Sequence, residues 1–376
     1  MSRVLIANWR DPWHPEGGGS ELYAEEVATR LVERGHDVTV FTAAYEGAAS
    51  RERRDGITFH RRGGHLTIYP WFALKLLARR FGRIDAILET QNGMPFLATL
   101  FTRAPVVVLV HHVHREQWPV VGPVLARIGW FMESRAAVRL NRGNRYVAVS
   151  DVTRRELISL GVRAGDITTA YNGLPAVPET VRSRPPKAVE PRLVVLSRLV
   201  PHKQIQHAIE LMPRVLAEFP DATLHVMGSG WWHDELVAMR ESLGLGESVR
   251  FLGHVTEEQK YAELAAAWVH LLPSLKEGWG LSIVEAASMG TPSIAYRDAG
   301  GVQESIEDGR TGLLAEDRQQ FVEQTLHVLR DAEERERLGA NAESRATQFS
   351  WETTTDRIEE TLGVDARRSG ATHSSA

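Results

Sequence analysis

Residues 273–304 read PSLKEGWGLSIVEAASMGTPSIAYRDAGGVQE, and this stretch carries the clearest information about the fold. A short apolar run at 269–272 precedes it. Gly278 and Gly280 then mark a turn, residues 281–289 suit a helix, and residues 292–295 form another apolar run. We therefore predict a strand, a glycine-rich loop, a helix and a second strand, which together are the repeating unit of a parallel α/β sheet.

The same alternation continues along most of the chain. In the first half we expect a helix over residues 20–34, with Ser20 as its N-cap and Gly35 as its stop, and strands at 4–7, 38–41, 86–88, 106–110 and 146–149. In the second half we expect helices from Gln204 and Trp232 and strands at 193–196, 223–227 and 249–252. Because the strands are continuously apolar, the predicted fold class is α/β, with parallel sheets covered on both faces.

The chain of 376 residues is long enough for two domains, each with its own core. Five prolines fall between residues 174 and 191, where apolar periodicity is lost. We therefore predict a first domain over 1–175, a linker over 176–191 and a second domain from residue 192. The final residues, 364–376, are small and polar, and we expect them to be disordered.

The composition excludes several classes of protein. The chain has no cysteine, so disulfide frameworks, thiolate zinc sites and cysteine nucleophiles are ruled out. A net charge of −4 and a pI near 6.4 predict no general attraction to nucleic acid. The first apolar run is too short for a signal peptide, and no run reaches the length of a membrane-spanning helix. We therefore expect a cytoplasmic protein.

Three glycines, Gly17, Gly18 and Gly19, stand directly before the first predicted helix. Helix N-terminal amides bind anions and glycine lets a phosphate approach closely, so this loop is a candidate phosphate site. The alternative is a flexible turn. The spacing is not GxGxxG and no acidic residue clearly follows the second strand, which disfavours a nicotinamide-dependent oxidoreductase.

Four charged side chains follow predicted strands of the second half. Arg198 and Lys203 flank a short loop before a helix, where two cations suit a diphosphate. Glu277 lies in a loop and Glu285 lies eight residues later in the helix that follows. Carboxylates accept directional hydrogen bonds and so suit sugar and ribose hydroxyls. Taken singly, each of the four could be a solvated surface charge.

The spacing of Glu277 and Glu285 resembles the EX7E motif of the retaining GT-B glycosyltransferases, family 4. Six further segments occur in that family's order: GGGS at 17–20, PVVVLVHH at 105–112, YVAVSD at 146–151, YNGLP at 171–175, SRLVPHK at 197–203 and FSW at 349–351. The resemblance therefore covers nearly the whole chain. It implies a GT-B fold of two Rossmann-like domains facing across a cleft, with 192–349 on the donor side and a helix at 350–363 that returns to the acceptor side.

The resemblance also implies the site residues. Gly18 and Gly19 would lie near the donor phosphates, and Arg198 and Lys203 would hold the diphosphate. Glu277 would contact the donor sugar and Glu285 the ribose. Further donor contacts are implied for Gly228, Gly230, His254, Val255, Gly278, Trp279, Gly280 and Leu281. No cofactor is implied, and the absence of any Asp-x-Asp pair predicts a site without a metal ion.

His111 closes the predicted strand at 106–110 and matches the family's active-site histidine beside the transferred sugar. Whether His111 or His112 faces the site is left open by the sequence. His111, His112 and His114 could be mistaken for a metal cluster, but alternating side-chain directions argue against three convergent ligands.

The activity implied is a retaining, metal-independent transfer of a hexosyl group. The donor would be a UDP- or GDP-sugar, and the acceptor a glycan, a lipid-linked molecule or a small molecule. The alternatives are a non-catalytic sugar-nucleotide-binding partner protein and a GT-B-type epimerase.

Contact with the inner face of the plasma membrane is a further expectation. Residues 127–156 hold seven Arg against three acids, and a second basic, apolar set comprises Trp71, Phe72, Lys75, Arg79 and Arg80. Such faces can lie on anionic lipid. A solvated helix with an inward apolar stripe is the competing interpretation.

Overall fold

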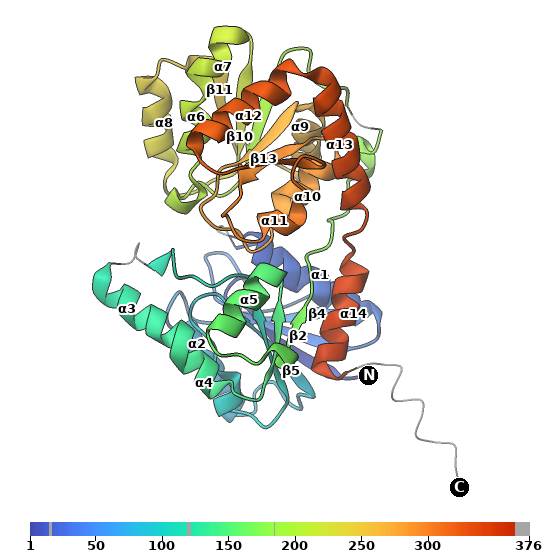
Figure 1. Cartoon of the computed structure of the whole chain (residues 1–376). Coiled ribbons are helices and arrows are strands. Elements are labelled where there is room, and N and C mark those ends of the chain that lie inside the picture. Colours follow the sequence, from blue (N-terminus) through green and yellow to red (C-terminus); the bar gives the residue numbers. More distant parts are fainter. Residues whose placement is uncertain (15–16, 119–121, 184, 365–376) are drawn as a thin grey trace. The chain divides into compact units, whose positions relative to one another are not determined.

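The computed structural model describes residues 1–14, 17–118, 122–183 and 185–364, and it divides into two compact units. Unit 1 comprises Met1–Gly173 and the described residues from Trp351 onward, and unit 2 comprises Leu174–Ser350. Each unit is a sheet covered by helices (Figure 1). The predicted α/β class with two parallel-sheet domains is therefore confirmed. The predicted disordered tail lies outside the described residues apart from Val364.

Unit 1 contains an eight-stranded sheet in the order β3-β4-β2-β1-β5-β6-β7-β8. In this sheet β3 and β4 pair antiparallel, and the other neighbouring strands pair parallel. The strands are β1 (Arg3–Ala7), β2 (Asp37–Thr42), β3 (Arg51–Arg54), β4 (Ile57–Arg61), β5 (Ala86–Gln91), β6 (Val106–Val110), β7 (Arg145–Ala148) and β8 (Ile167–Thr169). The helices are α1 (Gly19–Glu33), α2 (Ile68–Leu77), α3 (Pro123–Phe131), a π-helix (Met132–Ala137), α4 (Val138–Leu140), α5 (Asp151–Ser159) and α14 (Trp351–Leu362).

Unit 2 contains a six-stranded parallel sheet in the order β11-β10-β9-β12-β13-β14. The strands are β9 (Arg192–Leu196), β10 (Thr223–Met227), β11 (Val249–Gly253), β12 (Val269–Leu272), β13 (Ser293–Tyr296) and β14 (Gly312–Ala315). The helices are α6 (Gln206–Glu210), α7 (Met212–Glu218), α8 (His233–Ser242), α9 (Glu257–Ala266), α10 (Leu281–Ser288), α11 (Val302–Ser305), α12 (Arg318–Arg330) and α13 (Ala332–Ala346).

Both sheets reverse their direction of growth next to their first strand. In unit 1 the chain adds β2 on one side of β1 and β5 on the other. In unit 2 it adds β10 on one side of β9 and β12 on the other. Ligands of open α/β sheets bind beyond the carboxyl ends of the strands at such a switch point, because the two flanking loops leave in opposite directions. The loops after β9 and β12 are therefore the expected place of a ligand site in unit 2.

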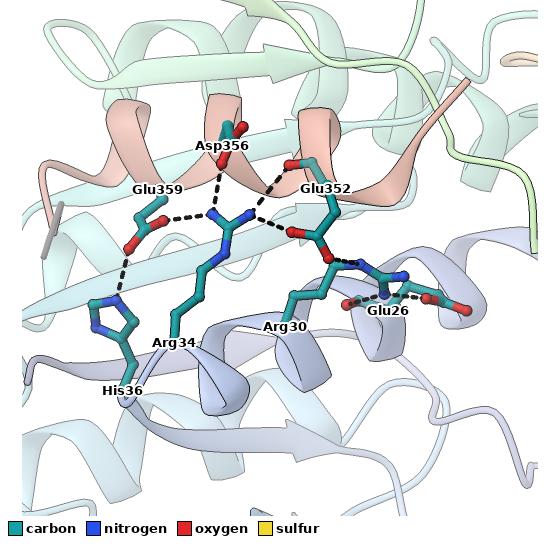
Figure 2. Close-up of polar contacts among 7 residues, drawn as sticks. All are labelled: Glu26, Arg30, Arg34, His36, Glu352, Asp356 and Glu359. Carbon is teal, nitrogen blue, oxygen red and sulfur yellow. Dashed lines mark hydrogen bonds and ion pairs between the residues drawn. The ribbon is translucent and has the colours of Figure 1, made fainter. Parts of the chain in front are cut away.

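Helix α14 packs against α1 within unit 1, although the two are more than 300 residues apart (Figure 2). Arg34, at the end of α1, contacts three carboxylates of α14: Glu352 at 2.7 Å, Asp356 at 2.8 Å and Glu359 at 2.6 Å. The other carboxylate oxygen of Glu359 lies 2.8 Å from Nε2 of the buried His36. Acids spaced by four and three residues share one helix face, so a single arginine reaches all of them. This network attaches α14 to the end of α1 and to His36, the residue before β2.

One local prediction was wrong, and one strand was missed. Helix α1 begins at Gly19 with Gly18 as its N-cap, so Ser20 is not the cap. The Glu21 carboxylate accepts hydrogen bonds from the Gly18 amide at 2.8 Å and the Ser20 hydroxyl at 2.9 Å, which replaces a serine cap. Strand β3, with the sequence RERR, was not predicted because it is a polar edge strand without an apolar pattern.

The proline-rich segment expected to be a linker packs on unit 2. Val181 is buried with the core side chains around Tyr261, and Lys187 Nζ donates to the Ala267 carbonyl at 2.7 Å. The Trp268 indole donates to the Ala188 carbonyl at 2.8 Å. Prolines remove regular hydrogen bonding but leave carbonyl groups that can accept from elsewhere.

Candidate functional site

The loops at the switch point of unit 2 bring Lys203 and Glu277 together. Lys203 ends the 3₁₀ turn Pro201–Lys203 after β9, and Glu277 lies in the loop after β12. Lys203 Nζ is 2.6 Å from Glu277 Oε1, and the side chains are 14% and 12% exposed. Burial by itself would raise the pKa of Glu277, but the Lys203 ammonium holds that pKa below its ordinary value. The pair therefore keeps an ionised carboxylate at the edge of the sheet.

Arg198 lies in the same loop after β9, and its side chain is exposed. Its guanidinium has no hydrogen-bond or ion-pair partner in the part of the chain that the structure describes. A guanidinium that is not neutralised by the protein can bind an anion without first breaking a contact.

Gly228 and Gly230, after β10, pack closely against this loop. Gly228 has φ +126°, and a Cβ there would lie 2.0 Å from the Ser197 carbonyl oxygen. A Cβ on Gly230 would lie 2.2 Å from the Leu199 carbonyl oxygen. Glycine is needed at both positions because the two loops touch through their backbones.

The loop of Glu277 is held by residues that follow β13. The Glu277 amide donates to the Ala299 carbonyl at 2.9 Å, and the Gly301 amide donates to the Glu277 carbonyl at 3.0 Å. A Cβ on Gly301 would lie 2.0 Å from the carbonyl oxygen of Gly278. Two backbones in contact thus fix the position of Glu277 independently of any side chain.

Helix α10 begins directly after this loop, at Leu281. Its N-cap is Gly280, which has φ +86° and carries no capping side chain. The first-turn amides are therefore not capped by a side chain and remain suited to an anion or an oxygen of a ligand. Trp279 is different, because its ring is buried and packs edge-on against Phe349 at 5.0 Å between centroids. Its contribution to a donor would come from the backbone.

Glu285 lies further along α10 and is buried, with only 6% of its side chain exposed. Its Oε1 is 2.6 Å from Nζ of Lys260, which lies on α9. Lys260 also donates to both carboxylate oxygens of Glu257, at 2.8 and 2.7 Å. Burial raises the pKa of Glu285 above its ordinary value, and the opposing effect of Lys260 does not cancel that rise. Glu285 therefore shares its lysine with a second carboxylate and has a raised pKa, whereas the pKa of Glu277 is lowered.

His254 and Val255 follow β11 and lead into α9. His254 is exposed, whereas Val255 packs against the core that contains Tyr261 and Leu264. Thr256 then caps α9 by accepting from the Gln259 amide at 3.3 Å. The segment therefore has one side chain that packs on the core, Val255, and one exposed imidazole ring, that of His254.

The glycine loop of unit 1 leads into α1. Gly18 is its N-cap and Gly19 its first residue. The Gly18 amide already donates to Glu21, so a phosphate bound there would compete with a carboxylate that belongs to the same helix.

His111 follows β6 in unit 1 and is buried. Its ring meets Tyr23 edge-on at 5.3 Å, and its carbonyl accepts from the Thr153 hydroxyl at 3.0 Å. Burial, followed by the nearby His114, lowers the pKa of His111 to about 3. The ring is therefore neutral at physiological pH, and its Nε2 is buried without a partner among the described residues.

The other two histidines of this segment point to different partners. His112 Nε2 lies 2.9 Å from Gln117 Nε2, and His114 Nδ1 lies 3.0 Å from Glu133 Oε1. Glu133 is fully buried and also accepts from the Trp118 indole at 2.7 Å. Within the described ranges, no three His, Asp or Glu side chains are grouped as metal ligands. The metal-free expectation itself stays a prediction.

Sequence reasoning missed Lys260 and Glu133, which contact Glu285 and His114 respectively. A signal for Lys260 exists in the composition. The chain has 44 Lys and Arg in total, of which only five are Lys, so each lysine stands out against an arginine background. Glu133 had no comparable signal, because it lies 19 residues from the histidine that it contacts.

The fold and the loop chemistry define a class of protein. Two parallel α/β sheets, with lysine, arginine and carboxylates at the carboxyl edge of one of them, are typical of enzymes that bind nucleotide-activated ligands. Two family models match the chain side by side: Glycosyltransferase Family 4 over residues 17–176, and Glycosyl transferases group 1 over residues 178–345. The chain belongs to the GT-B glycosyltransferases of the family 4 type.

Named relatives agree with this assignment. A GDP-mannose-dependent alpha-(1-6)-phosphatidylinositol monomannoside mannosyltransferase of Mycobacterium tuberculosis is 27% identical over 98% of this chain and all of its own length. Glycogen synthase of the same organism is 25% identical over 93% of this chain and 92% of its own length.

Solved structures show the same fold. Sucrose-phosphate synthase from Thermosynechococcus elongatus has a TM-score of 0.80 at 20% identity, over 96% of this chain and 98% of its own. The Anabaena protein HepE in complex with UDP and glucose has a TM-score of 0.74 at 22% identity, over 96% of this chain and all of its own. The predictions of family and fold are therefore confirmed. No helix in the described residues is long and apolar enough to cross a bilayer.

Proposed function

We propose that this glycosyltransferase moves a hexosyl group from a UDP- or GDP-sugar to its acceptor, with retention of configuration and without a metal ion. The observation that carries the proposal is the Lys203–Glu277 pair at the switch point of unit 2, with the unpaired cation of Arg198 in the same loop. Two cations would stabilise the diphosphate as charge grows on it, the task that a metal ion performs in other transferases. The relatives named for GDP-mannose and solved with UDP support both donor classes.

In this proposal each carboxylate binds hydroxyls rather than the anomeric carbon. Glu277 orients the sugar ring through the oxygen that Lys203 does not hold, and Glu285 receives the ribose. The uncapped N-terminus of α10 and the backbone of residues 278–281 would face the donor, as would the glycine turns at Gly228 and Gly230. His254 and Val255 would border the base, and Gly18 and Gly19 the phosphates.

His111 would support the sugar at the reacting centre. Its neutral ring carries one N–H, which can donate to a sugar hydroxyl, and its carbonyl has a lone pair beyond the one that Thr153 occupies, whose negative end can stabilise positive charge on an oxocarbenium-like ring. It is not a covalent nucleophile in this scheme. The acceptor would attack on the face that the diphosphate leaves, and the leaving phosphate would take the acceptor's proton.

Product stereochemistry and metal dependence test the proposal together. Product NMR should show the donor's anomeric configuration, and turnover should be unchanged in EDTA. UDP or GDP should raise the free energy of unfolding by about 2.7 kcal/mol when its concentration is 100 times the dissociation constant. An inverted product, or turnover that requires Mg²⁺ or Mn²⁺, would rule this mechanism out. Nucleotide binding without any transfer would favour a non-catalytic partner protein.

We also propose that the acceptor is lipid-linked and that α3 contacts the membrane. Four apolar side chains of α3 are more than half exposed: Val124, Leu125, Ile128 and Phe131. Exposed arginines lie on and after the same helix at 127, 135, 139 and 142. An apolar face flanked by cations suits an anionic bilayer surface. The earlier stripe on α2 is less suitable, because Phe72 is fully buried in the core.

Sedimentation with vesicles tests this surface. Wild-type protein should bind phosphatidylglycerol vesicles and not phosphatidylcholine vesicles, and Ile128→Ser/Phe131→Ser should remove the binding without changing thermal stability, since both side chains are already exposed. Equal binding of the variant would show that α3 is not the contact.

A further inference from the structure

Glu285 is held by one oxygen and open at the other. Lys260 Nζ contacts Oε1 at 2.6 Å, and Oε2 has no hydrogen-bond partner among the described residues. Both side chains are nearly enclosed, with 10% of Lys260 and 6% of Glu285 exposed. A carboxylate fixed in this way presents a single acceptor in a single direction.

Lys260 is itself fixed by a second carboxylate. Both oxygens of Glu257, one turn earlier on α9, accept from its ammonium. An ammonium has three donors, so these contacts fully determine its position. Because α9 follows His254 and Val255 directly, Lys260 also ties Glu285 to the segment that would border the base.

Lys260 faces a buried carboxylate that has one oxygen without a hydrogen-bond partner among the described residues. Burial of such a group without a counter-charge favours its neutral form. Without Lys260, Glu285 would take up a proton and could rotate.

We propose that Lys260 is a positioning residue for nucleotide recognition: it keeps Glu285 ionised and turned so that Oε2 accepts hydrogen bonds from the two ribose hydroxyls of the donor. The inference rests on the proposed function, since it requires that a nucleotide donor binds at α10. It adds a residue of α9 to that site and assigns it an effect on ribose recognition alone.

The test compares a nucleotide with its 2′,3′-dideoxy form. Calorimetric dissociation constants are measured for UDP, GDP and their dideoxy forms on wild type, Lys260→Met, Lys260→Arg and Glu285→Gln. Wild type should bind the hydroxylated nucleotide roughly 10- to 100-fold more tightly, as expected for hydrogen bonds to a charged group. Lys260→Met and Glu285→Gln should both reduce this ratio to within about threefold, while Lys260→Arg should retain most of it.

The double variant Lys260→Met/Glu285→Gln carries no buried charge and serves if Lys260→Met does not fold. It should have the same ratio as Glu285→Gln. A Lys260→Met protein that binds both nucleotides more weakly but keeps the wild-type ratio would overturn the proposal, since Lys260 would then only support the fold. Equal binding of both nucleotides to wild type would overturn it too, while leaving the transfer reaction standing. Failure of every nucleotide to bind would remove the proposed function as well.

Discussion

Two lysine–carboxylate pairs in unit 2 have the same length and different electrostatics. Lys203–Glu277 and Lys260–Glu285 each join Nζ to Oε1 at 2.6 Å. Burial raises both carboxyl pKa values, but Lys203 brings the pKa of Glu277 below its ordinary value, whereas Glu285 stays above it. Lys260 shares its charge with Glu257, which also repels Glu285 directly. The Nζ–Oε1 distance alone therefore does not determine the carboxyl pKa, because the other charges near the lysine also contribute.

The carboxylates of the two pairs also lie on different kinds of structural element. Glu277 lies on a loop fixed by backbone contacts with residues 299–301, whereas Glu285 lies within a helix. The first arrangement suits a group that must meet a sugar at one exact point, and the second suits a group that needs only to be oriented. The following variants separate the two pairs.

The largest effect should come from removal of Lys203. Lys203→Ala leaves Glu277 buried without its counter-charge and takes away a cation from the leaving diphosphate, so kcat/KM should fall by roughly 10²–10³. Arg198→Ala should cause a loss of the same order, because it removes the other cation. Steady-state kinetics with the donor varied would measure both. Arg310→Ala, an exposed arginine elsewhere in unit 2, is the control. Turnover of Lys203→Ala within threefold of wild type would show that this pair does not act on the donor.

The next effect should arise from Gly301→Ala. A methyl group there would meet the Gly278 carbonyl at 2.0 Å and displace the loop that carries Glu277. A shift of that kind should lower kcat roughly tenfold to a hundredfold. The ratio between hydroxylated and dideoxy nucleotides should not change, because Glu285 lies on a different element. Gly165→Ala, where a Cβ meets nothing within 4 Å, is the matched control. Loss of the ribose preference as well would show that the two carboxylates are not independent.

A smaller effect should appear in stability, with opposite signs for the two carboxylates. The lowered pKa of Glu277 means that its ionised form stabilises the fold above the ordinary carboxyl pKa, a contribution lost as the pH falls through the folded value. The raised pKa of Glu285 means that its ionised form costs stability as the pH rises through the folded value. At pH 7, Glu277→Gln should therefore lower the Tm and Glu285→Gln should raise it. Thermal unfolding followed by circular dichroism would measure both, and shifts of the same sign would contradict the contrast.

Much of the fold and the loop positions of the first pair could be predicted from the sequence, but the different electrostatics of the two pairs could not. Strands at 106–110, 223–227 and 269–272 agree with the structure residue by residue, because buried parallel strands are continuously apolar. The loop positions of Lys203 and Glu277 followed from strand ends and a family motif. Lys260 and Glu285 are 25 residues apart on two helices, and no local pattern states that their side chains meet. The polar strand β3 was missed because it has no apolar period to detect.

The smallest effect should come from Glu257→Gln, which tests why the pairs differ. Glu257 is 58% exposed and outside the proposed contacts with the donor, so its loss should change turnover by less than about threefold. It should nevertheless free the Lys260 ammonium for Glu285 and remove a repelling charge, and both changes lower the pKa of Glu285 toward that of Glu277. Ribose recognition requires the ionised carboxylate, so the preference for the hydroxylated nucleotide should persist to lower pH in Glu257→Gln than in wild type. Glu258→Gln removes an exposed charge from the same first turn of α9 and controls for the helix dipole. If the two variants lose the preference at the same pH, charge sharing by Lys260 is not what separates the second pair from the first.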